Sequence, residues 1–146
     1  MKLFVDTRQK KDKHLNIEQY CRDNNITAVQ KCLLVGDYML ENGKIAVDTK
    51  QSLQELANDL YADKLAFNKK YKKCYTQNIK LVVLVEEPIK KISELIAWRS
   101  KHTKISGRFL VDLISDLQMS YGISFKFCEK SQTGKVLIDL LQGVGI

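Results

Sequence analysis

VGDYMLENGKIAVDTK, residues 35–50, places strand-like residues on both sides of Asn42-Gly43. Asn-Gly is the preferred pair for a two-residue type I′ turn, so the stretch is predicted to form a β-hairpin. Counting outward from that turn puts Asp37 directly opposite Asp48, with both side chains on one face of the sheet. Lys50 lies two residues beyond Asp48 and points to the same face. The stretch therefore predicts two carboxylates and one ammonium group in a cluster, although like charges facing each other destabilise a ladder.

Two carboxylates this close shift each other's pKa unless a cation lies between them. Mg²⁺ takes one or two carboxylates and keeps several waters, which suits a phosphate substrate. A metal there would polarise a phosphoryl oxygen and lower the pKa of a bound water, and Lys50 would stabilise charge in the transition state. A structural interpretation stays open beside this phosphodiester-hydrolysis site, with Asp37 marking a bulge and Asp48 pairing with Lys50. In the site interpretation, removing either acid relieves repulsion and leaves stability unchanged or raised.

The remaining chain alternates strand and helix patterns, which predicts one α/β domain over residues 1–146. Strands are expected at residues 2–6, 28–40 and 44–50 (the two arms of the hairpin), 79–87 and 123–128; helices are expected at 16–25, 52–74, 88–100, 107–122 and 133–142. The near-continuous apolar run at 79–87 is typical of a strand covered on both faces. The predicted architecture is a three-layer α/β/α fold with a mixed central sheet.

Composition excludes several function classes. The longest apolar run, Leu81 to Val85, is far shorter than a membrane span, and the first residues do not resemble a signal peptide. No Cys-x-x-Cys motif exists, and neither His14 nor His102 lies near a cysteine in the sequence, so zinc and redox motifs are not expected. Four free cysteines indicate a reducing, cytoplasmic compartment. The segment QTGKV lacks the first glycine of a phosphate loop, so no nucleotide cofactor is expected, and Thr133 is interpreted as a helix cap.

The net charge of +7 indicates an anionic partner, most commonly nucleic acid. Two basic runs are candidates for contacting phosphates without reading sequence. Their residues are Lys69, Lys70, Lys72 and Lys73 in the first, and Arg99, Lys101, Lys104 and Arg108 in the second. The first run also suits the C-terminal end of the predicted helix 52–74, with Glu55, Asp59 and Asp63 at the other end complementing its dipole. Both interpretations stay open. Ser52 and Glu55 form a predicted capping box.

Five motifs, in order along most of the chain, resemble the XPF-type structure-specific endonuclease domain of the PD-(D/E)xK nuclease superfamily. They are FVDTRQ at residues 4–9, VGDYM at 35–39, VDTK at 47–50, SLQEL at 52–56 and LVVLVEE at 81–87. The resemblance implies a stand-alone nuclease core of restriction-endonuclease-like fold. It also implies a metal-dependent endodeoxyribonuclease that uses Mg²⁺ or Mn²⁺ on branched or flapped duplex DNA in repair or recombination, with a homodimer as a further expectation.

Residue roles follow from the same resemblance. Asp37 and Asp48 would hold the metal, and Lys50 would be the catalytic lysine. Asp6 would reach the metal or its waters, unless it only pairs with Arg8. Arg8 would contact a phosphate or serve as that partner. Glu86 would support the site from outside or act as an ordinary strand-end acid.

The sequence departs from the family pattern at four positions. Gln9 stands where the family has Glu, Asp48 replaces Glu, Thr49 replaces Arg, and Gln54 stands where the last Asp is expected. The departures at Gln9, Asp48 and Gln54 favour an alternative, a catalytically impaired nuclease-fold module that binds nucleic acid or a protein partner. A restriction-type nuclease cutting plain duplex at fixed sites is a third interpretation.

Overall fold

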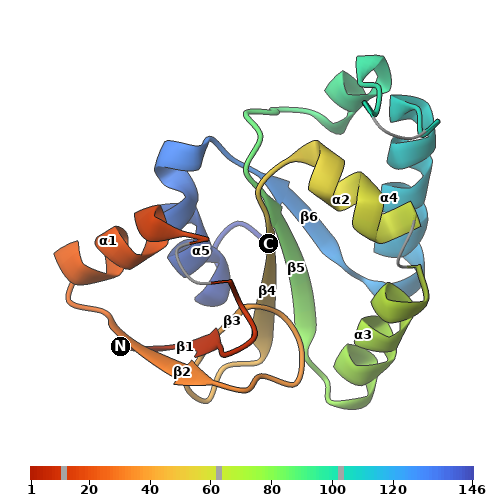
Figure 1. Cartoon of the computed structure of the whole chain (residues 1–146). Coiled ribbons are helices and arrows are strands. Elements are labelled where there is room, and N and C mark those ends of the chain that lie inside the picture. Colours follow the sequence, from red (N-terminus) through yellow and green to blue (C-terminus); the bar gives the residue numbers. More distant parts are fainter. Residues whose placement is uncertain (11–12, 62–63, 102–103) are drawn as a thin grey trace.

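A computed structural model describes residues 1–10, 13–61, 64–101 and 104–146, and contains a six-stranded mixed sheet with the strand order β2-β1-β3-β4-β5-β6 (Figure 1). The strands are β1 (Lys2–Asp6), β2 (Thr27–Lys31), β3 (Tyr38–Leu40), β4 (Ile45–Lys50), β5 (Lys80–Val85) and β6 (Ser124–Phe127). The helices are α1 (Leu15–Asp23), α2 (Leu53–Tyr61), α3 (Lys64–Thr76), α4 (Gly107–Tyr121) and α5 (Thr133–Leu141), with short 3₁₀ helices η1 (Ile92–Ala97) and η2 (Lys130–Gln132).

The direction of β3 determines where the functional residues meet. β3 is antiparallel to both of its neighbours, β1 and β4, whereas β1 pairs in parallel with β2, and β4 with β5. The C-terminal ends of β1, β4 and β5 therefore lie at the same edge of the sheet as the beginning of β3. In sheets with parallel strands, ligands usually bind at this edge.

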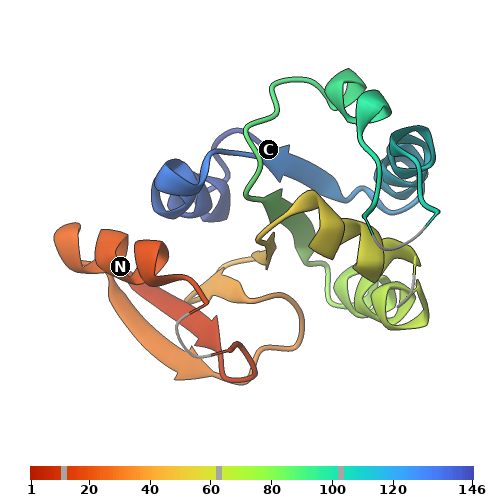
Figure 2. The same ribbon diagram turned by 45° about the horizontal axis from the view of Figure 1, so that its top comes forward.

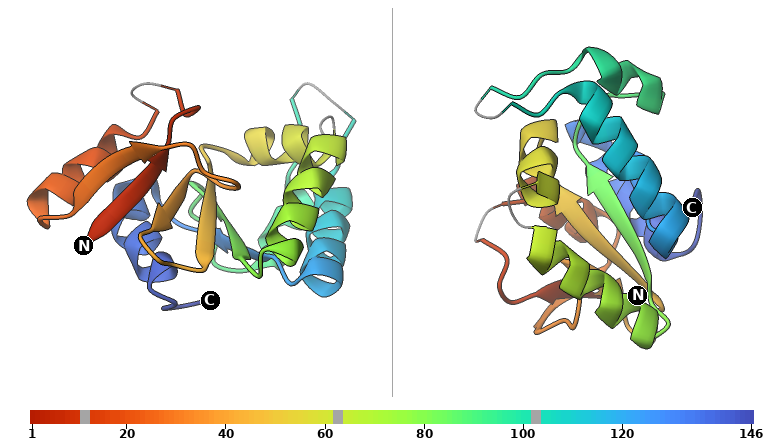
Figure 3. Two further views of the ribbon diagram at one scale, coloured as in Figure 1. Left: turned by 90° about the horizontal axis from the view of Figure 1, so that it is seen from below. Right: turned by 90° about the vertical axis from the view of Figure 1, so that its right-hand side faces the viewer.

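Helices cover both faces of the sheet, which confirms the predicted three-layer α/β/α fold. Helices α1 and α5 pack on one face, and α2, α3 and α4 pack on the other (Figures 1 and 3). Alternate residues of the central strands enter the two cores: Val47, Val82 and Leu84 face α1 and α5, whereas Ala46, Val83 and Val85 face the other three helices. Among the described residues, no helix has the length and apolar character needed to cross a membrane.

The hairpin has the predicted register but a different turn. Tyr38 pairs with Val47 and Met39 with Ala46, as expected for a two-residue loop. The turn is not type I′, because Asn42 has a positive φ of 63° and Gly43 does not. Instead, the Gly43 amide donates to the Leu40 carbonyl at 2.9 Å, so Asn42 is the third residue of the turn. That position needs a positive φ in a type II turn, and asparagine tolerates it.

The first arm of the hairpin, predicted as one strand over residues 28–40, is two strands. β2 pairs in parallel with β1 at the border of the sheet, and β3 begins only at Tyr38. Gly36, at φ 74°, precedes a bulge in which both Asp37 and Tyr38 face Val47, since the Asp37 amide donates to the Val47 carbonyl at 2.9 Å. The expectation that Asp37 pairs directly with Asp48 is therefore wrong. A bulge re-aims the side chain it carries, and here that side chain is Asp37.

Two predicted helices also differ. The single helix expected over residues 52–74 is replaced by α2 and α3, whose axes point in different directions (Figure 2). A straight helix of that length would extend about 35 Å, whereas the neighbouring strand β5 covers about 20 Å. Two helices keep both apolar faces on the sheet. The helix expected at 88–100 is the short 3₁₀ helix η1, whereas α1, α4, α5 and β6 form close to their predicted positions.

Candidate active site

A basic cleft of about 660 Å³ opens at the edge where β4 ends and β3 begins. It is lined by six basic residues and three acidic ones, together with five uncharged residues. The basic residues are Arg8, Lys10, Lys13, Lys69, Lys70 and Lys73, and the acidic residues are Asp6, Asp37 and Glu55. The excess of positive charge favours a polyanion in this cleft.

The Asp37 carboxyl is held by Thr49. Asp37 Oδ2 accepts hydrogen bonds from the Thr49 amide at 2.8 Å and from the Thr49 hydroxyl at 2.7 Å. Asp37 keeps some exposed surface in the cleft, but the atoms packed around its carboxyl are the main reason why its pKa is raised from 3.8 to about 6. The negative charge of Asp48 raises the pKa of Asp37 further, and the two bonds from Thr49 oppose the shift.

Asp48 lies beside Asp37 but in a different electrostatic environment. It is 3% exposed, and its Oδ2 lies 3.0 Å from Lys70 Nζ and 3.6 Å from Lys50 Nζ. Burial alone would raise the pKa of Asp48, but the positive charges of Lys50 and Lys70 hold it below its ordinary value. Asp48 is therefore ionised at neutral pH, and its charge is balanced by residues of the chain itself.

Lys50 is 5% exposed and forms an ion pair with Asp59 of α2 in addition to its contact with Asp48. Burial would lower the pKa of Lys50, but the acidic groups around it raise that pKa above its ordinary value. Lys50 is consequently an ammonium ion at any working pH and can act through its charge, not as a general base. The sequence predicts Asp59 only as a complement of the helix dipole, and this is wrong. Asp59 lies in the last turn of α2, where an acid does not complement the dipole.

Asp6 and Arg8 pair with each other. Arg8 Nε and Nη2 donate to the two carboxylate oxygens of Asp6 at 3.0 and 3.1 Å, and the Leu33 amide donates to Asp6 Oδ1 at 3.0 Å. Both residues line the same cleft as Asp37. The structure thus brings Asp37, Asp48 and Lys50 together and engages Asp6 in the arginine pair that the sequence left open.

The predicted basic runs separate into two groups. Lys69, Lys70 and Lys73 of α3 line the cleft, whereas the exposed Lys72, Lys104 and Arg108 are not among its lining residues. Lys70 differs from its neighbours because its ammonium group rests on Asp48.

A metal site, if formed here, would use Asp37 and Asp48. Among the described residues, no group of three or more His, Cys, Asp or Glu side chains has metal-binding geometry. Two carboxylates are nevertheless enough for Mg²⁺, which keeps its remaining positions for water and phosphate. The ammonium group of Lys70 on Asp48 shows that a cation fits against this carboxylate. The four cysteines are free, as predicted.

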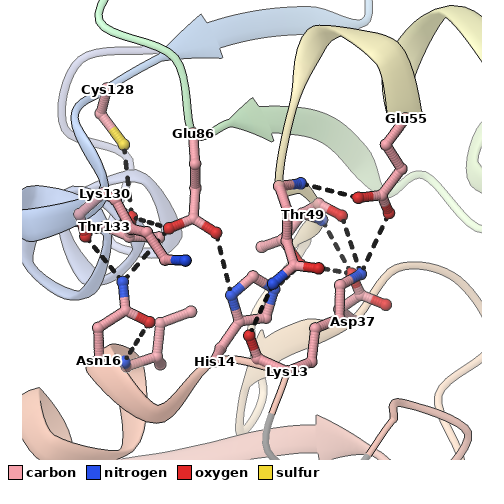
Figure 4. A network of polar contacts seen from close by, with 12 residues as sticks. Lys13, His14, Asn16, Asp37, Thr49, Glu55, Glu86, Cys128, Lys130 and Thr133 are labelled. Atoms are coloured by element: carbon pink, nitrogen blue, oxygen red, sulfur yellow. Dashed lines mark hydrogen bonds and ion pairs between the residues drawn. The ribbon is translucent and has the colours of Figure 1, made fainter.

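The sequence interpretation missed the partners on the other side of β4. His14, considered only as a zinc ligand, contacts Thr49 and Glu86 (Figure 4). Thr133 does not cap α5 but bonds to Glu86 from inside the helix. Glu86, an acid that ends a buried strand, is one of the residues that the sequence analysis names; nothing local marks His14. The capping interaction of Ser52 with the Glu55 amide is confirmed at 3.1 Å. Asp63 and His102 lie outside the described residues.

The raised pKa of Asp37 predicts a pH-dependent effect of Asp37→Asn in metal-free buffer. An acid whose pKa is raised by folding lowers the stability of the folded protein when it is ionised. This loss is absent at a pH below 3.8, the unfolded pKa, and complete at a pH above about 6, the folded pKa. The asparagine oxygen can still accept both bonds from Thr49. We expect the variant to melt on the order of 5 °C higher than the wild type at pH 7.5, with no difference near pH 3.5. A lower melting temperature at pH 7.5 would show that the Asp37 charge is structural.

Asp48→Asn provides the opposite case. Because the pKa of Asp48 is lowered, its charge stabilises the folded protein at neutral pH and loses that effect as the pH falls through the folded pKa. Asp48→Asn should therefore melt below the wild type at pH 7.5. This corrects the sequence-based expectation that either substitution relieves repulsion.

Comparison with known proteins finds similarity in structure without similarity in sequence. No protein-family model and no curated protein matches the chain. The structure is similar to XPF from Aeropyrum pernix, with a TM-score of 0.71 and 19% identity. The match covers 97% of this chain but 64% of the other, so the chain spans less than two thirds of that structure. At this identity the likeness shows the fold, which is an α/β fold of the XPF-like, restriction-endonuclease-like kind.

Proposed function

We propose that the chain is a metal-dependent DNA endonuclease that hydrolyses phosphodiester bonds with Mg²⁺ or Mn²⁺, and that branched or flapped duplex is its substrate. One observation carries the proposal: Asp37 lines a basic cleft, and the buried Asp48 lies beside it with Lys50 Nζ 3.6 Å away. The XPF-like fold supports it. The preference for branched DNA rests on the resemblance of the sequence motifs.

In this proposal Asp37 and Asp48 hold the metal through carboxylate oxygens. A metal bound there supplies a polarised phosphoryl oxygen and a water of lowered pKa. Lys50, charged and fixed between Asp48 and Asp59, stabilises negative charge that develops on the phosphate. Lys69 and Lys73 neutralise backbone phosphates along the wall of the cleft.

A second candidate, a nuclease-fold module that binds nucleic acid or protein without cleaving, is favoured by one feature. Lys70 and Lys50 already neutralise Asp48, and Asp59 forms an ion pair with Lys50. The charged groups of this cluster therefore already have partners within the protein. In this alternative these ion pairs stabilise the fold, and the basic cleft is the part of the protein that binds the partner.

Incubating the pure protein with end-labelled flap, branched and plain duplexes tests the proposal. Metal-dependent cleavage of the flap or branched substrate, lost in Asp37→Asn, is the expected result. DNA binding without cleavage in either metal would favour the second candidate. Cleavage of plain duplex at fixed sites would instead indicate a restriction-type nuclease.

Substitutions of Lys50 separate a transition-state role from simple binding. Because a group that acts on developing charge contributes little to ground-state binding, Lys50→Ala should slow single-turnover cleavage by about 100- to 1,000-fold. The Kd for DNA in Ca²⁺ should change little. Lys50→Arg should not restore the rate, since a planar guanidinium cannot place a point charge at the same position. Wild-type turnover of Lys50→Arg would contradict this role.

Lys70 is predicted to compete with the metal for Asp48. Lys70→Met removes the ammonium group that rests on this carboxylate, so Mn²⁺ should bind more tightly in a calorimetric titration. Lys69→Met is the matched control, because it removes the same charge from the same cleft without a contact to Asp48. Equal gains in affinity for the two variants would show a general charge effect instead of competition.

The lysines of the cleft wall predict the salt dependence of DNA binding. Replacing Lys69 and Lys73 together by Gln should weaken binding to all sequences alike and reduce the slope of log K against log salt by about 2. Lys104→Gln with Arg108→Gln removes the same charge from residues outside the cleft, and the slope should stay unchanged. If only the variant with Lys104→Gln and Arg108→Gln shows a smaller slope, the DNA binds near the start of α4 and not in the cleft.

A further inference from the structure

A chain of polar side chains leads from Asp37 through β4 into the opposite layer of the protein (Figure 4). The Thr49 hydroxyl lies 2.7 Å from Asp37 Oδ2 and 2.9 Å from His14 Nε2. The other ring nitrogen, His14 Nδ1, lies 3.2 Å from Glu86 Oε1. That contact has the length of an ion pair, although its angle is not that of a hydrogen bond.

Three members of this chain are shielded from water. Thr49 is 0% exposed, His14 is 4% exposed and Glu86 is 7% exposed. Buried polar groups cost free energy unless they are paired, and apolar side chains of similar volume often stabilise a core as well or better. Fold stability therefore gives no reason of its own for a histidine and a glutamate in the layer between β4 and helices α1 and α5.

The Thr49 hydroxyl carries a single proton, and this determines which atoms donate and which accept in the row of hydrogen bonds from His14 to Asp37. An ionised Asp37 carboxylate can only accept, so the single hydroxyl proton of Thr49 is donated to Asp37. The Thr49 oxygen must then accept from the N–H at His14 Nε2. A histidine that donates here prevents the Thr49 hydroxyl from turning away from Asp37.

Glu86 holds the imidazole ring from the far side. Its Oε2 accepts from the Thr133 hydroxyl at 2.7 Å and from Asn16 Nδ2 at 3.3 Å, which ties it to α5 and α1. Its other oxygen, Oε1, lies 3.2 Å from His14 Nδ1, and this contact is attractive when one proton lies between the two atoms. The ring therefore lies between Glu86 on one side and Thr49 on the other.

We propose that His14 and Glu86 are positioning residues that act through the Thr49 hydroxyl to fix the orientation of the Asp37 carboxylate. Where the proposal concerns metal binding, it rests on the proposed function. Outer hydrogen-bond partners of metal ligands commonly change metal affinity about 10- to 100-fold when they are removed.

Paired substitutions test the chain by calorimetric titration with Mn²⁺ alone. Thr49→Val and His14→Leu should each weaken Mn²⁺ binding about 10- to 100-fold. Thr49→Ser keeps the hydroxyl, and His14→Gln keeps an N–H donor, so both should recover most of the affinity. Cys21→Ala is the control, a buried change on the same helix as Asn16 and in the same core as Leu137. It lowers stability without altering the row of polar side chains, so Mn²⁺ affinity should stay unchanged.

The order of the chain gives a stricter test. If His14 acts only through Thr49, the double variant His14→Leu/Thr49→Val should bind Mn²⁺ no more weakly than Thr49→Val alone. Additive losses would overturn the proposal, because the two residues would then act independently. An effect of His14→Leu no larger than that of Cys21→Ala would overturn it as well, in favour of a purely structural role.

A metal-free measurement keeps this proposal distinct from the proposed function. The Thr49 amide donates to Asp37 Oδ2 at 2.8 Å, so its hydrogen-exchange rate, measured by NMR, reports on the carboxyl. In His14→Leu and Glu86→Gln this amide should exchange faster than in Cys21→Ala at matched stability. Unchanged exchange would overturn the positioning chain. Faster exchange in a protein that binds no Mn²⁺ would sustain the chain and reject the metal site.

Discussion

The burial of two neighbouring carboxyl groups is the constraint that shapes this edge of the protein. Asp37 and Asp48 lie where water can solvate them poorly, so each negative charge needs a partner within the chain. The two acids satisfy that need in different ways. Asp37 receives hydrogen bonds from Thr49 and keeps a raised pKa, whereas Asp48 receives two ammonium groups and has a lowered one. Neighbouring acids whose pKa values are shifted in opposite directions are common at functional sites of proteins.

The pleat of β4 assigns these partners to opposite layers. Asp48 and Lys50 point toward α2 and α3, where Asp59 and Lys70 meet them. Thr49, between them in sequence, points toward α1 and meets His14. One strand of alternating side chains thereby connects the cleft with both helical layers. The bulge at Asp37 completes the arrangement, because it turns that carboxyl toward the Thr49 backbone instead of the regular cross-strand position.

The resting arrangement on the α3 side is self-neutralised. With Lys70 on Asp48 and Asp59 on Lys50, the charges that would serve catalysis are engaged with each other. In the proposed function, metal and DNA meet a site in which one contact, between Lys70 and Asp48, has to be exchanged. Lys70 lines the same cleft as Lys69 and Lys73, so a phosphate bound there is a natural new partner for its ammonium group.

The sequence by itself determined the layers, the hairpin register and the proximity of Asp37, Asp48 and Lys50. The strand-like residues that flank Asn42-Gly43, the apolar run of β5 and the helical spacing elsewhere are local properties that survive folding. The turn type, the bulge and the division of residues 52–74 into two helices were missed, since each depends on how a segment fits the finished sheet. The same reason applies to the roles of Asp59, His14 and Thr133, and to the contact between Glu86 and His14. These residues are separated in sequence from Asp37, Asp48 and Thr49, and only the tertiary structure decided which of them the buried charges would meet.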